Sequence, residues 1–154
     1  MNIKSAYYSA ESITFRQLTE LGSLVAYVFF MIVFLIFGKA DLFIQLFISL
    51  FFIMVVAILI KSLYFKKRPS KHLTRNFVER LDAASFPSIH SMRTFSLVFW
   101  VSSYFNNLLL TVYLSIVGVF VVYSRIYLKK HYWVDVIFGL IFSFIINHII
   151  WWAL

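Results

Sequence analysis

Residues 42–60 read LFIQLFISLFFIMVVAILI, and this stretch decides the class of protein. None of its side chains carries a charge, and it ends at Lys61. A helix needs about 20 predominantly apolar residues to cross the hydrocarbon core of a bilayer, with a lower limit of about 17. Inside lipid the chain must satisfy its own backbone hydrogen bonds, which a helix does. We therefore predict that residues 42–60 form a transmembrane helix.

The rest of the chain continues this pattern on both sides. The predicted spans are 21–37, 42–60, 88–105, 108–127 and 132–154. The composition agrees, because the chain is 62% hydrophobic and only 13% charged, whereas a soluble domain is about half apolar and about a quarter charged. Soluble, disordered, collagen-like and disulfide-stabilised classes are excluded, the last because the chain has no cysteine. We predict an all-α fold: one integral membrane domain over residues 1–154, a transmembrane helical bundle of about five spans.

A long polar stretch, residues 62–87, separates the second and third spans. Within it Leu73, Phe77 and Leu81 recur every four residues, with charged side chains between them. This pattern predicts a short amphipathic interfacial helix between spans 2 and 3. It could be a solvated connector or a lid that contacts lipid headgroups. Residues 1–20 lack the compact apolar core of a signal peptide and are compatible with another short interfacial helix.

Most of the positive charge gathers on one membrane face. The helix order places the ends of spans 2 and 4 on the same face as the beginnings of spans 3 and 5. Of the 14 Lys and Arg residues, only Lys39 falls on the opposite face. The positive-inside rule would make the cationic face cytoplasmic. Alternatively, the cations bind an anionic substrate and carry no topological message.

Three clusters of reactive side chains lie on the cationic face. They read Lys-x6-Arg-Pro at 61–69, Pro-Ser-Ile-His at 87–90 and Ser-Arg-x5-His-x3-Asp at 124–135. A phosphoryl group carries about −1.5 to −2 charges near neutral pH, and its slow hydrolysis is accelerated mainly by fixed positive groups around the transferring oxygens. Lys61, Arg68 and Arg125 supply such groups. Ser88 and the amide of Ile89 lie at a predicted helix N-terminus, which favours anions.

Two histidines can divide the remaining chemistry. His131 and Asp135 are four residues apart, so they share one face if the fifth span is already helical there. A carboxylate bonded to one imidazole nitrogen would fix the tautomer and leave the other nitrogen free to attack phosphorus. His90, on a different helix, could protonate the leaving oxygen. Acidic residues near these groups are too few for an obvious divalent-cation site, so we expect no metal and no cofactor.

Together the three motifs resemble those of the type 2 phosphatidic acid phosphatase (PAP2) superfamily, whose membrane members are lipid phosphatases. They occur in the family's order over residues 61–135. One position departs from the pattern, since Ile89 stands where the family has the glycine of Pro-Ser-Gly-His. Ordinary helical angles suffice in the first turn of a helix, so we expect Ile89 to be tolerated. The resemblance implies that His131 forms a phosphohistidine, that Asp135 orients it, that His90 is the general acid and that no metal is required.

The expected function is therefore hydrolysis of a phosphate monoester or pyrophosphate on a membrane lipid. By resemblance, the candidate substrates are polyprenyl pyrophosphate, phosphatidylglycerophosphate, phosphatidate and the 1-phosphate of lipid A. Two alternatives stay open: a lipid phosphotransferase with the same intermediate, and a non-enzymatic protein that binds anionic lipids. The abundant aromatic residues fit packing against lipid rather than nucleic-acid binding. The sequence leaves open the oligomeric state and whether Arg75, Arg80 or Arg93 contacts the headgroup.

The family resemblance and the charge asymmetry make opposite predictions about which side of the membrane the active site faces. The resemblance implies an integral protein of the cell (inner) membrane whose active site is extracytoplasmic, because related lipid phosphatases mostly act there. The charge asymmetry predicts a cytoplasmic site. We expect the extracytoplasmic arrangement, since a substrate accounts for several of the cations.

Overall fold

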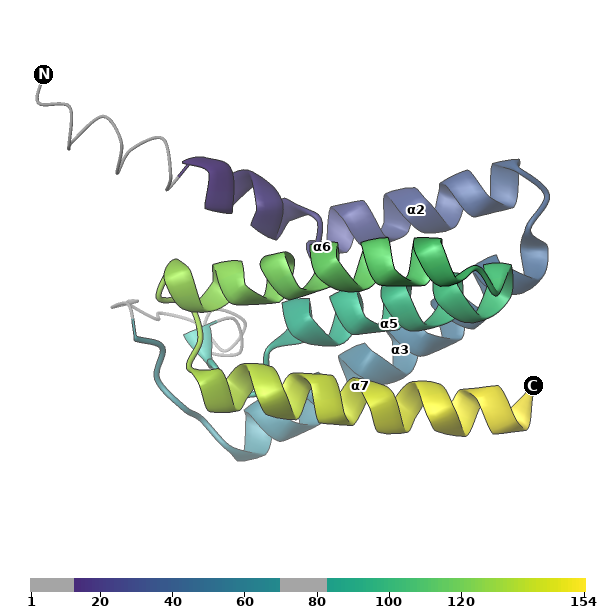
Figure 1. Ribbon diagram of the computed structural model, residues 1–154. Helices are drawn as coiled ribbons and strands as arrows, with labels where there is room; N and C mark the ends of the chain where they lie inside the picture. Colours follow the sequence, from purple (N-terminus) through teal and green to yellow (C-terminus); the bar gives the residue numbers. More distant parts are fainter. Residues whose placement is uncertain (1–12, 70–82) are drawn as a thin grey trace, which may run out of the picture.

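The computed structural model describes residues 13–69 and 83–154, and these residues are predominantly helical (Figure 1). A short helix, Ile13–Glu20, comes first. It is followed by α2 (Leu24–Ile36), α3 (Ala40–Leu63), α5 (Ile89–Phe105), α6 (Leu108–Tyr127) and α7 (Trp133–Ala153). The predicted all-α class is confirmed. The predicted interfacial helix around Leu73, Phe77 and Leu81 lies outside the described residues.

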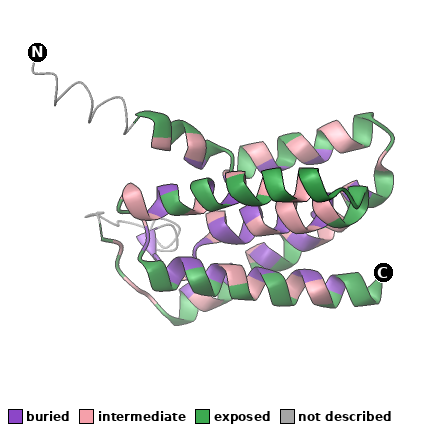
Figure 2. Cartoon of the chain, viewed as in Figure 1, coloured by how far each residue is buried: buried purple, intermediate pink, exposed green. Residues whose placement is uncertain are grey.

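Helix α5 occupies the centre of the bundle, where it packs against α2, α3, α6 and α7. Its inner faces are buried, whereas the outward faces of α6 and α7 are exposed (Figure 2). The exposed side chains are mostly large and apolar, among them Leu109 and Val119. An outer surface of this kind suits lipid rather than water.

Polar side chains inside the bundle bond to one another across helices. Trp100 Nε1 on α5 donates hydrogen bonds to Ser49 Oγ on α3 at 2.6 Å and to Asn147 Oδ1 on α7 at 2.8 Å. Tyr27 on α2 donates to the carbonyl of Leu46 on α3 at 3.1 Å. Hydrogen bonds between helices stabilise membrane bundles, because lipid offers no alternative partner. This network therefore holds α2, α3, α5 and α7 in register.

The structure corrects the first predicted span, 21–37. The helix Ile13–Glu20 is bent by 47° relative to α2, and the two are separated by a break at residues 21–23. Ser23 begins α2, because its side chain accepts a hydrogen bond from Ala26 N at 3.1 Å and so caps the helix. Helix α2 has 13 residues, which makes it about 20 Å long, shorter than a hydrocarbon core of about 30 Å.

Three of the described helices, α3, α6 and α7, are long and apolar enough to cross a membrane, or four spans if the bent pair counts as one. Helix α5 has 17 residues and contains Arg93, and it falls outside that count. The number of about five spans thus remains a prediction. The chain turns between α5 and α6 at two asparagines: Asn106 adopts a left-handed conformation with φ of 45°, and Asn107 Oδ1 accepts from Leu110 N at 3.0 Å.

Candidate active site

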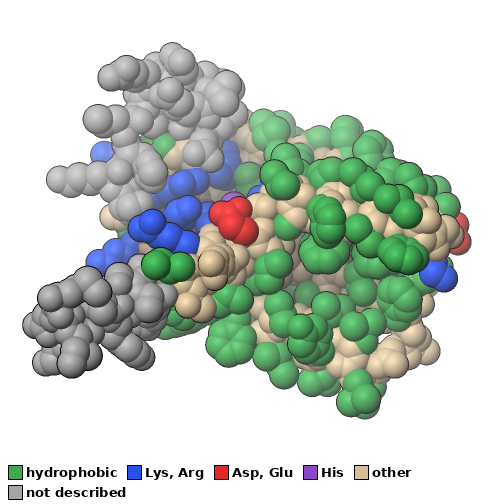
Figure 3. Space-filling view, turned by 90° about the horizontal axis from the view of Figure 1, so that it is seen from above, with side chains coloured by type: hydrophobic (Ala, Val, Ile, Leu, Met, Phe, Trp, Pro, Cys, Tyr) green, Lys and Arg blue, Asp and Glu red, His purple; other side chains and the backbone are tan. Residues whose placement is uncertain are grey.

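The helix order brings the three sequence clusters to one end of the bundle. The end of α3, the beginning of α5, the end of α6 and the beginning of α7 all lie there, opposite the C-terminus (Figure 1). Figure 3 shows Lys and Arg side chains gathered at this end, next to a histidine, while hydrophobic side chains cover most of the remaining surface seen. The predicted convergence of distant residues is therefore present in the fold.

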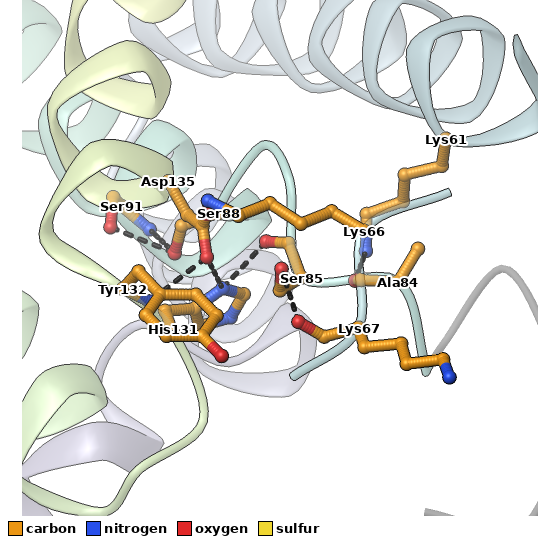
Figure 4. A network of polar contacts seen from close by, with 10 residues as sticks. All are labelled: Lys61, Lys66, Lys67, Ala84, Ser85, Ser88, Ser91, His131, Tyr132 and Asp135. Carbon is orange, nitrogen blue, oxygen red and sulfur yellow. Dashed lines mark hydrogen bonds and ion pairs between the residues drawn. The ribbon is translucent and has the colours of Figure 1, made fainter. Parts of the chain in front are cut away.

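A buried segment, residues 83–88, connects the clusters (Figure 4). Lys61 Nζ, at the end of α3, donates a hydrogen bond to the carbonyl of Ala84 at 2.8 Å. Ser85 N donates to the carbonyl of Lys66 at 2.8 Å, and Lys67 forms an antiparallel bridge with Ala84. The segment that precedes α5 is thus fixed against the Lys-x6-Arg-Pro motif.

His131 lies in the connection between α6 and α7, with only 3% of its surface exposed. Its Nδ1 is 2.7 Å from the carbonyl oxygen of Ser85. Because a carbonyl can only accept, Nδ1 carries the proton, and in the neutral ring the lone pair is on Nε2. Burial, together with the positive charges of Arg125, Arg68 and Lys61, lowers the pKa of His131 to about 2, although the hydrogen bond to Ser85 acts in the opposite direction. His131 is therefore a neutral imidazole with an available Nε2.

The hydrogen bond that we predicted between Asp135 and His131 is not formed. His131 Nδ1 lies 3.9 Å from Asp135 Oδ2, which is too far for a hydrogen bond. Instead, Oδ1 pairs with Lys66 Nζ at 2.6 Å, and Oδ2 accepts from Tyr132 N at 2.9 Å (Figure 4). Asp135 thus caps α7 and binds a lysine, while a backbone carbonyl orients the histidine.

The three predicted phosphate-binding cations lie close enough to His131 to influence its charge. Arg125, Arg68 and Lys61 all act electrostatically on its ring. Arg125 is buried, and its Nη1 donates to Thr19 Oγ1 in the helix Ile13–Glu20 at 2.8 Å. Lys61 is also buried, and Arg68 is partly buried. Positive charge is therefore concentrated near the His131 imidazole, an arrangement that favours a phosphoryl group.

Ser88 and Ile89 begin α5 as predicted. The N–H of Ser88 donates to the carbonyl of Asp135 at 3.0 Å, so this amide has a partner within the protein. Ser88 Oγ caps the helix by accepting from Ser91 N and Ser91 Oγ. Ile89 has no positive φ and packs against the buried cluster that contains Met92. The backbone of Ile89 therefore does not require glycine, and the tolerance of Ile89 in the site stays a prediction.

His90 lies one residue further along α5, where Arg125 and His131 both act on its ring. Its Nδ1 is 3.5 Å from Arg93 Nη2, and Arg93 Nε donates to the carbonyl of Gly22 at 3.2 Å. Arg93, whose role the sequence left open, therefore joins His90 to the break before α2. His90, on α5, and His131, in the connection before α7, thus lie near one another and near the same Arg125.

Sequence reasoning missed four residues that support the site. They are Lys66, Thr19 and Gly22, whose contacts are given above, and Gly139. A Cβ at Gly139 would lie 2.8 Å from the carbonyl oxygen of Ser88, so only glycine lets α7 approach the beginning of α5 this closely. None of the four is a defining position of the three motifs, although Lys66 lies at a variable position of the first. Within the described residues, no group of three His, Asp or Glu side chains is placed to hold a metal ion.

The sequence model of the PAP2 superfamily matches residues 42–154, so this chain belongs to that superfamily. Among solved structures, LpxE from Aquifex aeolicus is similar to it, with a TM-score of 0.77 and 23% sequence identity over 92% of this chain and 85% of that one. No curated protein is similar enough in sequence to count as a relative. The family and the fold are those of PAP2-type membrane lipid phosphatases.

Proposed function

We propose that this protein hydrolyses a phosphate monoester or pyrophosphate on a membrane lipid through a phosphohistidine at His131, without a metal. The observation that carries the proposal is the hydrogen bond from His131 Nδ1 to the carbonyl of Ser85. It puts the proton on Nδ1 and leaves the lone pair on Nε2, in a ring on which three cations act electrostatically.

The first step forms a bond between His131 Nε2 and phosphorus and breaks the bond between phosphorus and the leaving oxygen. His90 gives that oxygen its proton, so the dephosphorylated lipid leaves as an alcohol or a monophosphate. Lys61, Arg68 and Arg125 stabilise the negative charge on the equatorial oxygens in the transition state. Their contribution is electrostatic and needs no proton transfer.

The second step releases the enzyme. Water attacks the phosphohistidine, the bond between phosphorus and Nε2 breaks, and inorganic phosphate departs. His90, left neutral by the first step, accepts the proton of that water and so returns to its starting form. In this cycle Asp135 acts at a distance, through Lys66 and the first turn of α7, and not by a direct bond to His131.

A phosphate-release assay tests this proposal with the purified protein, EDTA and the four candidate lipid classes. We expect phosphate from at least one class, with activity retained in EDTA and lost in the His131→Ala variant, which should still bind lipid. Release that required an acceptor other than water would indicate a phosphotransferase. Lipid binding without phosphate release from any class would indicate the non-enzymatic alternative.

Sidedness can be tested because the chain contains no cysteine. We propose that the site faces the extracytoplasmic side. Ser62→Cys places a thiol at the exposed end of α3 near the site, and Leu154→Cys places one at the opposite end. An impermeant maleimide added to intact cells should label Ser62→Cys and leave Leu154→Cys unlabelled. The reverse labelling would place the site in the cytoplasm.

A further inference from the structure

An apolar groove begins beside the candidate acid and runs along α5 away from the charged end. On α5, Thr94, Leu97, Val98 and Val101 follow His90 at helical spacing and so share one side of the helix. They line a half-open cavity of about 140 Å³ together with residues of α2 and α6. Those partners include Phe30 and Phe34 on α2 and Leu114, Val117 and Val121 on α6.

Gly22 joins the groove to the active site. A Cβ at Gly22 would lie 2.8 Å from Thr94 Oγ1, 3.0 Å from Val121 Cγ1 and 3.5 Å from His90 Cδ2. The break before α2 therefore packs against both the candidate acid and the first residues of the groove. Thr94, the groove residue nearest to His90 in the chain, is one helical turn further along α5, so a molecule whose phosphate lies by His90 has the groove within reach of its first carbon atoms.

Thr94 stands at this junction with an unsatisfied hydroxyl group. Its side chain is 7% exposed, and among the described residues Oγ1 has no hydrogen-bond partner. Buried hydroxyls almost always have a partner, so this one indicates an acceptor that arrives with a ligand. Thr94 is also the one polar residue among those that line the groove. Beyond Thr94, the side chains that line the groove have no hydrogen-bonding groups for a sugar or a glycerol backbone.

We infer that the groove between α2, α5 and α6 binds the hydrocarbon chain of a lipid in which that chain is attached directly to the phosphate oxygen, as in prenyl and alkyl phosphates. This inference rests on the proposed function and narrows its substrate class. Thr94 donates its hydrogen bond to the oxygen that links phosphorus to the chain. An apolar cavity of about 150 Å³ holds a benzene molecule, so the groove accommodates about six carbons. The remainder of a longer chain extends into the bilayer.

Alkyl phosphates of increasing length test the inference in a fixed detergent. For the wild type, kcat/KM for phosphate release should rise at least about tenfold from ethyl to hexyl phosphate and then level off. Val117→Trp fills the groove from α6, whereas Val119→Trp adds the same ring to the lipid-facing side of that helix. The rise in kcat/KM with chain length should disappear in Val117→Trp and persist in Val119→Trp. Because both variants are assayed with the same substrates in the same detergent, differences in how the substrates partition into detergent affect them equally.

Other results overturn the inference in distinguishable ways. If the wild type releases phosphate equally from all chain lengths, or if both tryptophan variants retain the rise, the groove does not bind the chain, although the proposed function stands. If the wild type releases no phosphate from any ester, the proposed function fails and the inference fails with it.

A second measurement needs no variant and so does not depend on the folding of Val117→Trp. A dodecyl phosphate with a photoreactive diazirine at its sixth carbon should label residues 94–101 or 114–121 of the wild type, and unlabelled dodecyl phosphate should compete. Labelling confined to other surfaces would overturn the inference. Labelling that only dodecanol, and not dodecyl phosphate, displaces would also overturn it, because the groove would then hold an ordinary membrane chain.

Discussion

Lys66 Nζ lies 2.6 Å from Asp135 Oδ1. This ion pair takes the place of the direct bond to His131 that the sequence led us to expect for Asp135. The carboxylate is fully buried, whereas the lysine side chain is 26% exposed. Lys66 comes from the segment after α3 and Asp135 from the first turn of α7. The pair therefore connects the first motif to the third and neutralises a buried charge beside the nucleophile.

Removal of this lysine should disturb the site through Asp135. In Lys66→Met the buried carboxylate keeps Tyr132 N but loses its counter-charge, which we expect to cost about 1–3 kcal/mol of stability, reduced from the value for fully buried pairs by the partial exposure of the lysine. Thermal unfolding measures this cost, and kcat/KM should fall in parallel. Lys67→Met, at an exposed neighbouring position, is the matched control.

A double-mutant cycle identifies the cause. If Lys66 acts through Asp135, then Lys66→Met should have little further effect in an Asp135→Asn background, and Lys66→Arg should retain most of the activity. If the losses of activity caused by Lys66→Met and Asp135→Asn were additive, Lys66 would not act through Asp135.

Thr19 is predicted to be a positioning residue for Arg125. Its hydroxyl accepts from Arg125 Nη1 at 2.8 Å, and a hydrogen bond to a charged group contributes about 1.5–3 kcal/mol. Thr19→Val should therefore lower kcat/KM at least about tenfold, because the guanidinium is no longer held for the phosphate. Steady-state kinetics on the preferred lipid measure the effect.

Two further variants separate positioning from a general loss of stability. Thr19→Ser retains the hydroxyl and should restore most of the activity, while Gln17→Ala, on an exposed face of the same helix, should have none of the effect. If Thr19→Ser were as impaired as Thr19→Val, the hydroxyl would not be what matters.

The pH dependence of stability should reveal the buried neutral state of His131. Its pKa is lowered from 6.5 to about 2 in the folded protein. Between these values the unfolded chain binds a proton that the folded protein excludes, so His131 makes stability fall as the pH drops below 6.5 and has no such effect above it. His131→Asn cannot titrate and retains an amide that can donate to Ser85. It should lose less thermal stability than the wild type between about pH 7.5 and about pH 5. Equal losses would mean that His131 is not buried in its neutral form.

Hydropathy located most of the helices because apolar runs and helices coincide in lipid. The predicted span 108–127 has the bounds of α6, and the fifth span, 132–154, differs from α7 by one residue at each end. The first span was wrong at its beginning, because apolar residues continue through the break. Leu21 and Leu24 lie on either side of Gly22 and Ser23, so hydropathy does not register that the helix stops and is capped anew.

The side chains of the site were predictable because their chemistry is visible in residue type and spacing. What holds them was not. Ser85 orients His131 through its carbonyl, and every residue has a carbonyl, so no sequence pattern distinguishes this one. Thr19 lies 106 positions from Arg125 in the chain. Spacing predicted that Asp135 shares a helix face with His131, but the helix begins only at Trp133, so the imidazole belongs to the preceding connection.

The central claim is that Nε2 of His131 becomes covalently bonded to phosphorus, and trapping that bond tests it most directly. Purified protein is mixed with radiolabelled lipid phosphate, quenched in alkali during turnover and digested for mass spectrometry. We predict that the wild type carries an alkali-stable, acid-labile phosphate on residue 131 and that His131→Asn carries none. A wild type that turns over without labelled histidine, or a His131→Asn variant that is labelled as strongly as the wild type, would contradict the account.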